Sequence, residues 1–243
     1  VAVGDHALAN YTGSGTVAVG NQALEDLTTG GQNTALGHDA GRDITTGDRN
    51  TALGYATLDL ITTASANTAV GAYALSAATT AAESTAVGEY AAQAVTTGNS
   101  NTAVGRRALY TATTGFVNVA IGEGALFGLT TGNKNVMLGN QAGYSLTTAV
   151  QSVAVGYQAL YNCTTSNSNT AVGFYALVNC TANNNTAVGE QAGVDITTGT
   201  NNTCLGLDAG RSSSPSGSIT TGDNNFVLGN NSIANLYCAD TSI

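Results

Sequence analysis

Residues Asn101-Thr102-Ala103-Val104-Gly105 are one copy of a short pattern that recurs along the whole chain. The glycine that closes the pattern returns every 17 residues, apart from two steps of 16 and one of 23. So short and sustained a period is typical of a solenoid, in which each copy forms one coil stacked on its neighbours. The sequence therefore predicts an all-β, parallel β-solenoid, or β-roll, of about fourteen 17-residue coils. The closing glycines are Gly4, Gly20, Gly37, Gly54, Gly71, Gly88, Gly105, Gly122, Gly139, Gly156, Gly173, Gly189, Gly206 and Gly229.

The composition argues against two classes of partner. Charged residues make up 9% of the chain, and the net charge of −9 includes only six basic residues, too few to neutralise a nucleic-acid backbone. No apolar run approaches the roughly 20 residues that span a bilayer, and the N-terminal residues do not resemble a basic-then-apolar signal peptide. We therefore expect neither a nucleic-acid partner nor membrane insertion.

The repeat also sets the domain organisation. It continues from residue 1 to residue 229, which predicts one shaft without an internal boundary. Six additional residues, about 212–217, predict a surface loop within the shaft. Residues 230–243 leave the pattern and predict an exit strand or cap. Because the chain opens inside a repeat, at Val1-Ala2-Val3-Gly4, we expect further sequence upstream.

The alternation of residues within the repeat predicts which side chains face outward. We number the repeat so that Asn101 is position 1 and Val117 is position 17, and expect strands at about positions 1–5 and 8–14. Position 4 is always Val, Leu or Ile and position 3 is nearly always Ala, so both faces of the first strand should be covered. We expect position 4 to fill the coil and position 3 to contact another copy of the chain. The predicted oligomer face comprises Ala35, Ala69, Ala103, Ala120, Ala154, Ala187 and Cys204.

Three further columns of the repeat have predicted structural roles. Where position 9 is Gly, as at Gly41 and Gly143, position 12 is a large aliphatic residue, Ile44 and Leu146, so the two positions should share the interior. The glycine at position 5 predicts a corner with positive φ or a close backbone approach. The asparagine at position 1 predicts a ladder of side-chain hydrogen bonds along the stack.

Positions 6, 7, 10 and 11 vary most and carry many of the aromatic residues. Exposed aromatic side chains on a rigid scaffold can bind glycans or protein receptors. The alternative is that the rings pack across seams between chains or cover small residues of neighbouring coils. Tyr110, Phe127 and Tyr161 lie on the far side of the alanine column at position 8. The candidate receptor ridge comprises Tyr55, Tyr73, Tyr90, Tyr157, Phe174 and Tyr175.

No residue constellation predicts catalysis, a metal site or a cofactor. Cys163 and Cys180 occupy position 12 of adjacent coils, which fits a disulfide, but the apolar residues of that column favour two buried free thiols. His6 and His38 are expected at the surface, without a nucleophile beside them. The carboxylates are scattered singly, unlike the pair of a glycosidase, and the chain has no Trp for a sugar platform. We therefore expect no enzyme.

The repeat resembles those of two kinds of fibrous protein. Ser152-Val153-Ala154-Val155-Gly156-Tyr157-Gln158-Ala159-Leu160-Tyr161-Asn162 closely resembles the repeats of bacteriophage tail fibres and tailspikes. The same pattern is similar to the head repeat of trimeric autotransporter adhesins of the YadA type, a left-handed parallel β-roll with a shorter period. The resemblance covers about residues 1–229 and implies a homotrimer.

The C-terminal residues resemble a different family. The segment from Phe226 to Ile233, together with Thr241-Ser242-Ile243, resembles the sequence preceding endosialidase-type intramolecular chaperone domains. Domains of that self-cleaving peptidase family trimerise a fibre and then cut themselves off just before a serine. The resemblance implies that a chain ending at Ile243 is the mature product, and that the precursor continues into a chaperone domain.

Together these features predict a structural and adhesive shaft of a phage tail fibre, attached to the virion tail and carried outside the cell. Its expected partners are two other copies of the chain and a glycan or protein receptor on a host cell. A trimeric adhesin on a bacterial outer surface is the alternative, and a capsule-depolymerase tailspike is the third hypothesis.

Overall fold

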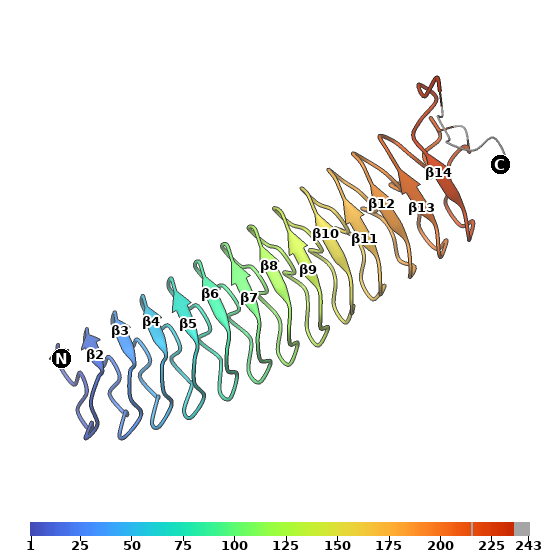
Figure 1. Cartoon of the computed structure of the whole chain (residues 1–243). Coiled ribbons are helices and arrows are strands. Elements are labelled where there is room, and N and C mark those ends of the chain that lie inside the picture. The colour runs from blue at the N-terminus through green and yellow to red at the C-terminus, as the bar shows by residue number, and fades with distance from the viewer. Residues whose placement is uncertain (215, 236–243) are drawn as a thin grey trace.

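Each coil contributes a single short strand to one long sheet. The structure, a computed structural model, describes residues 1–214 and 216–235. The coils follow one another along an elongated rod with β1 and β14 at opposite ends (Figure 1). All 14 strands are parallel and lie in chain order, which confirms the predicted parallel β-solenoid. The strands are β1 Ala2–Val3, β2 Val17–Val19, β3 Thr34–Leu36, β4 Thr51–Leu53, β5 Thr68–Val70, β6 Thr85–Val87, β7 Thr102–Val104, β8 Val119–Ile121, β9 Val136–Leu138, β10 Val153–Val155, β11 Thr170–Val172, β12 Thr186–Val188, β13 Thr203–Leu205 and β14 Phe226–Leu228.

The second strand predicted in each coil, at positions 8–14, is not formed in the described parts of the chain. The backbone at positions 7 and 9 is left-handed, as at Arg107 and Leu109, both with φ 55°. This conformation curls positions 6–11 into successive tight turns, and the Thr-Thr pair at positions 13 and 14 forms a bend instead of a strand. Those threonines connect coils instead. The amide N–H and the hydroxyl of Thr96 both donate to the carbonyl of Thr113, at 2.9 and 3.0 Å.

The two faces of the strand are the reverse of those predicted. Ala103 is fully buried inside the coil, whereas Val104 faces outward and is half-buried. At the same position 4, Leu36 and Ile121 expose 47% and 40% of their surface. The interior between strand and turns is filled by positions 8, 9 and 12, so position 3 is usually small. Met137 fits at this position because position 9 of its coil is Gly143, where an added Cβ atom would lie 2.9 Å from the Met137 sulfur. All seven residues of the predicted oligomer face lie in this interior column and are 0% exposed: Ala35, Ala69, Ala103, Ala120, Ala154, Ala187 and Cys204.

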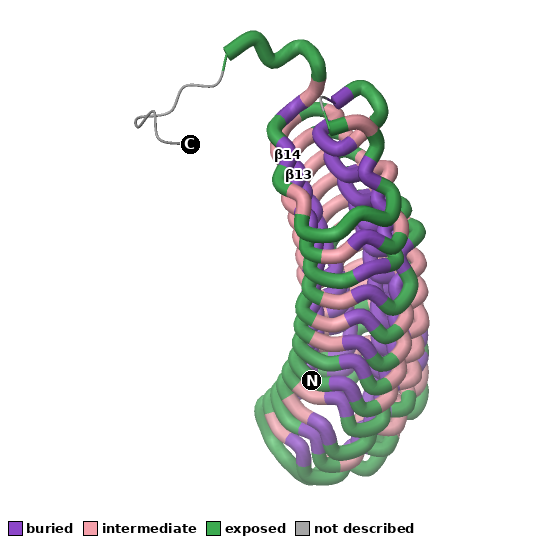
Figure 2. Tube along the Cα trace, turned by 90° about the vertical axis from the view of Figure 1, so that its right-hand side faces the viewer, coloured by how far each residue is buried: buried purple, intermediate pink, exposed green. Residues whose placement is uncertain are grey.

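Positions 9 and 12 share the interior, as predicted. A methyl group added to Gly41 would lie 2.9 Å from the side chain of Ile44 in its own coil and 2.9 Å from that of Leu24 in the preceding coil. A side chain at Gly41 would therefore collide with Ile44 and Leu24 as they are placed in this coil. Figure 2 shows the buried residues as continuous columns along the rod.

The glycine at position 5 satisfies both predicted requirements. Gly105 has φ +130°, a conformation that side chains strongly disfavour. A Cβ atom there would also lie 2.7 Å from the carbonyl carbon and oxygen of Gly122 in the next coil. The close approach therefore occurs between coils of one chain.

The predicted asparagine ladder is present and buried. The side-chain oxygen of Asn118 accepts the N–H of Asn135 in the next coil at 3.1 Å. Its amide nitrogen donates to the carbonyl of Gly132, across the interior of its own coil, at 3.0 Å. Each asparagine thus satisfies backbone groups both between coils and within a coil. Ser84 interrupts the asparagines but continues the ladder, because its hydroxyl accepts the N–H of Asn101 at 3.2 Å.

The inserted residues form a loop that leaves the stack and returns to it. The N–H of Ile219 donates to the carbonyl of Gly210 at 2.9 Å, and Ile219 re-enters the interior with 7% exposure. Pro215, within this predicted loop, lies outside the described residues. Of the predicted exit strand, residues 230–235 contain a turn and no strand, and residues 236–243 lie outside the described part of the chain.

Candidate interaction surfaces

The outward side of the sheet is a long, largely apolar surface. We call positions 2 and 4 of all strands the outer sheet face. Position 2 is mostly Thr or Val, position 4 is always aliphatic, and none of these residues is buried in any of the 14 strands. Contiguous apolar surface of this extent is rare on soluble monomers and marks interaction sites. The position-4 residues are Val3, Val19, Leu36, Leu53, Val70, Val87, Val104, Ile121, Leu138, Val155, Val172, Val188, Leu205 and Leu228.

The predicted receptor ridge divides into two groups of rings that contact one another from coil to coil. In the first group, Tyr55 meets Tyr73 edge-to-face at 5.1 Å between ring centroids, and Tyr73 stacks on Tyr90 at 5.2 Å. In the second, Tyr157 stacks on Phe174 at 5.4 Å, and Phe174 meets Tyr175 edge-to-face at 4.2 Å. Tyr55, Tyr157 and Phe174 are exposed by 46%, 42% and 43%, and the other three rings are half-buried.

A third set of rings, at position 10, forms a continuous stack. Tyr110, Phe127, Tyr144 and Tyr161 follow at centroid distances of 5.1, 4.8 and 5.2 Å, with interplanar angles of 12°, 6° and 17°. Tyr90 meets Tyr110 edge-on at 6.3 Å and joins this stack to the first group. The stacked faces are occupied by neighbouring rings, so ring edges and hydroxyls remain for a ligand. Tyr144 was not among the aromatic residues predicted to form these columns, although it lies 17 residues from both Phe127 and Tyr161.

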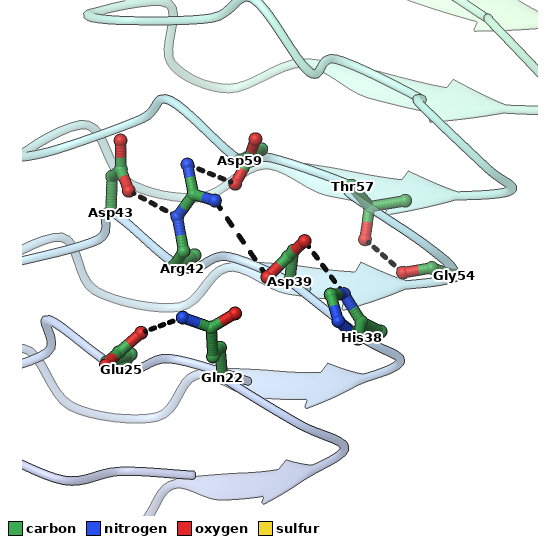
Figure 3. Close-up of polar contacts among 9 residues, drawn as sticks. All are labelled: Gln22, Glu25, His38, Asp39, Arg42, Asp43, Gly54, Thr57 and Asp59. Atoms are coloured by element: carbon green, nitrogen blue, oxygen red, sulfur yellow. Dashed lines mark hydrogen bonds and ion pairs between the residues drawn. The ribbon is translucent and has the colours of Figure 1, made fainter. Parts of the chain in front are cut away.

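A cluster of charged residues connects the coils that follow β3 and β4 (Figure 3). The Arg42 guanidinium lies 2.9 Å from Asp43, 3.3 Å from Asp59 and 3.9 Å from Asp39, and the Nδ1 of His38 lies 2.8 Å from Asp39. The hydrogen bond to Asp43 is the largest cause of a raised Arg42 pKa. Burial raises the pKa of Asp59 despite the attraction of Arg42. Three carboxylates sharing one guanidinium suit a structural clasp.

A second charged cluster spans three consecutive coils on the ridge. The Arg106 guanidinium lies 3.3 Å from Glu89 in the preceding coil and 3.2 Å from Glu123 in the following coil. All three side chains are about half exposed, so solvent screens these pairs and each contributes little to stability. Arg106 is therefore a neutralised part of the surface.

The cysteines and histidines match their structural interpretation. Cys163 and Cys180 are free thiols and fully buried, and burial raises the pKa of Cys163 well above its usual value. Burial also raises the pKa of Cys204 to about 11, so its thiolate is strongly disfavoured. The side chains of His6 and His38 are 59% and 51% exposed. Within residues 1–214 and 216–235, no group of three or more His, Cys, Asp or Glu residues is arranged to hold a metal ion.

Comparison of the chain with protein-family models and with curated proteins gives no match. In the described segments, no helix has the length and apolar character needed to cross a bilayer. The outer sheet face and the aromatic ridge, described above, are the two candidate interaction surfaces.

Proposed function

We propose that this chain is the shaft of a homotrimeric attachment fibre, of the kind that phage tails carry to reach a host-cell surface. The outer sheet face is the observation that supports the proposal. Its aliphatic column runs the full length of the sheet and stays partly exposed in the single chain, as with Val188 at 41%. Antiparallel sheets often leave one face in water, but parallel sheets are normally covered on both faces.

In the proposed assembly, the outer sheet faces of three chains meet around a common axis. Threonine and aliphatic side chains at positions 2 and 4, such as Thr102 and Val104, form its centre. The number of chains rests on the resemblance of residues 1–229 to trimeric adhesin heads. This arrangement replaces the alanine interface expected from the sequence, since those alanines are enclosed within each coil.

The turns of each coil then lie on the outside of the fibre. They carry the aromatic ridge and the charged clusters, whose side chains differ from coil to coil. A stiff rod that presents a variable outer surface suits attachment, because the scaffold holds the contact residues in fixed positions. The proposed work of the shaft is mechanical and adhesive, without a catalytic step.

Molar mass in native buffer tests the assembly. Light scattering should give about three times the 24.1 kDa of one chain. Glutamate at three adjacent outer-face positions, Val87, Val104 and Ile121, should yield folded monomers, because like charges would face one another at the axis. The matched control places three glutamates at the exposed threonines Thr97, Thr114 and Thr131, and should remain trimeric. A monomeric wild-type chain would contradict the proposal.

A further inference from the structure

A small hollow of about 120 Å³ lies on the ridge where the coils that follow β7, β8 and β9 meet. Arg107 comes from the first of these coils, Gly124 and Phe127 from the second, and Gln141 and Tyr144 from the third. The neutralised pair of Arg106 and Glu123 completes the lining.

The hollow exists because Gly124 has no side chain at position 7. The neighbouring coils place Arg107 and Gln141 at this position, each with φ 55°, and Gly124 has nearly the same φ of 65°. The backbone therefore accepts a side chain here, at a cost on the order of 1 kcal/mol for the left-handed conformation. A Cβ atom on Gly124 would lie 3.4 Å from the Tyr144 ring, which is ordinary contact. The fold therefore does not require a glycine at this position, and the missing side chain leaves the hollow open.

Two hydrogen-bond donors at the hollow have no acceptor among the described residues. The Arg107 guanidinium lies 6.0 and 5.9 Å from the ring centroids of Tyr90 and Tyr110, and it forms no ion pair with the described residues. The side-chain oxygen of Gln141 accepts a hydrogen bond from Gln158 at 2.6 Å, which leaves the amide hydrogens of Gln141 free. Because both groups line the same hollow, each can donate to one oxygen of a bound carboxylate.

The surroundings of the hollow favour a polysaccharide over a peptide. Its volume equals that of about four water molecules at ~30 Å³ each, enough for a carboxylate and part of a sugar ring. The stacked rings of Phe127 and Tyr144 offer edges and a hydroxyl, not an apolar pocket for an anchoring side chain. The open edges of the sheet lie at β1 and β14, away from the hollow, so a peptide cannot add a strand there.

We infer that this hollow binds the carboxylate of an acidic sugar unit in a host-surface polysaccharide, through Arg107 and Gln141. Neighbouring hydroxyl-bearing units then lie along the tyrosine edges of the position-10 stack. The inference rests on the proposed attachment function and names the class of ligand for it.

Binding of an oligogalacturonate to the assembled protein, measured by calorimetry at low salt, tests the site. Arg107→Gln should weaken binding by about tenfold or more, because a hydrogen-bonded ion pair is lost. Gly124→Gln should weaken binding to a similar extent, since it fills the hollow with the side chain that Gln141 provides in the next coil. Lys134→Gln is the control: this exposed lysine lies elsewhere on the coil of Gly124 and its loss changes the net charge equally. Thermal unfolding of each variant verifies its fold.

Several results would overturn the inference. Equal weakening by Arg107→Gln and Lys134→Gln would indicate unspecific attraction, and unchanged binding by Gly124→Gln would place the ligand elsewhere. A poly-glutamate that binds as tightly as the oligogalacturonate would point to an acidic peptide. A trimer that binds no oligogalacturonate refutes only the sugar site, whereas a monomeric mass refutes the fibre.

Discussion

The strand side and the turn side of each coil obey different constraints. On the strand side, the same small set of residues recurs because each one meets fixed neighbours: Asn118 bonds backbone groups in two coils, Ala103 fills a narrow interior, and Gly105 leaves no space for a Cβ atom. On the turn side, positions 6, 7, 10 and 11 contact mainly the residues above and below them and the solvent. Sequence variation is therefore concentrated in the columns where a substitution affects few neighbours.

The largest difference between the two strand faces should appear at adjacent residues. Ala103→Glu places a charge in the closed interior, at a cost of more than about 4 kcal/mol, and should abolish folding. Val104→Glu, one residue along and facing outward, should leave the coil folded. Far-ultraviolet circular dichroism and urea unfolding distinguish these outcomes. A folded Ala103→Glu chain that fails only to assemble would instead support the alanine interface between chains that the sequence predicted.

The buried ladder should be more sensitive than the polar residues of the outer turns. Asn118→Ala leaves the carbonyl of Gly132 and the N–H of Asn135 without partners, and should lower the free energy of unfolding by about 2–3 kcal/mol. The control is Asn99→Ala. The side chain of Asn99 is exposed and accepts the N–H of Ala82 at 2.9 Å, so water can replace it at a cost below about 1 kcal/mol. Equal urea midpoints for the two variants would contradict the comparison.

Within the turn side, a ring with two stacked neighbours should matter more than one with a single stacked neighbour. Phe127→Ala removes contacts with both Tyr110 and Tyr144 and should cost about 2 kcal/mol. Phe174→Ala removes a ring that stacks on Tyr157 and meets Tyr175 edge-to-face, but 43% of it is already exposed to water, so the change should cost about 1 kcal/mol. Thermal melting at one chain concentration measures both. The reverse order would show that the stack does not stabilise the rod.

The smallest effect is expected at the Arg42 cluster. Because burial raises the folded-state pKa of Asp59, ionisation of this carboxyl opposes folding above that pKa, and the penalty disappears as the pH falls towards the unfolded value. Asp59→Asn should therefore be stabilising at neutral pH by less than about 0.5 kcal/mol, and neutral in acid. Asp43→Asn should have the opposite sign, because it removes the negative charge that strengthens the 2.9 Å hydrogen bond donated by Arg42. Urea midpoints measured across this pH range provide the test.

The sequence predicted which repeat positions stack in columns better than it predicted whether a column faces inward or outward. The 17-residue period, the corner glycines and the paired volumes at Gly41 and Ile44 were sufficient for the stack, because each reflects contact between identical positions. The inward face was wrong, since positions 3 and 4 are both apolar and the pattern alone does not state how wide the interior is. The prediction of a second strand was wrong because non-glycine residues in the left-handed conformation, such as Leu109, cannot be recognised from their residue type.

The candidate site was predicted in part. Most of the aromatic columns followed from spacing, but the stacking that occupies the ring faces depends on side-chain orientation, which the period does not specify. The hollow at Gly124 was missed because a glycine outside the regular columns looked like ordinary variation. Its significance appears only when three neighbouring coils are placed together.

The loop between Gly210 and Ile219 has a consequence for the evolution of the rod. Six extra residues leave and re-enter the stack without disturbing the pairing of Thr203 with Phe226 across the insertion. Gly210 and Ile219 tolerate a longer segment between them because their backbone hydrogen bond closes the coil. Additional residues can therefore be inserted between positions 9 and 12 without changing the register of the strand that follows. Insertions at this turn would change what the rod displays without altering the stacked coils.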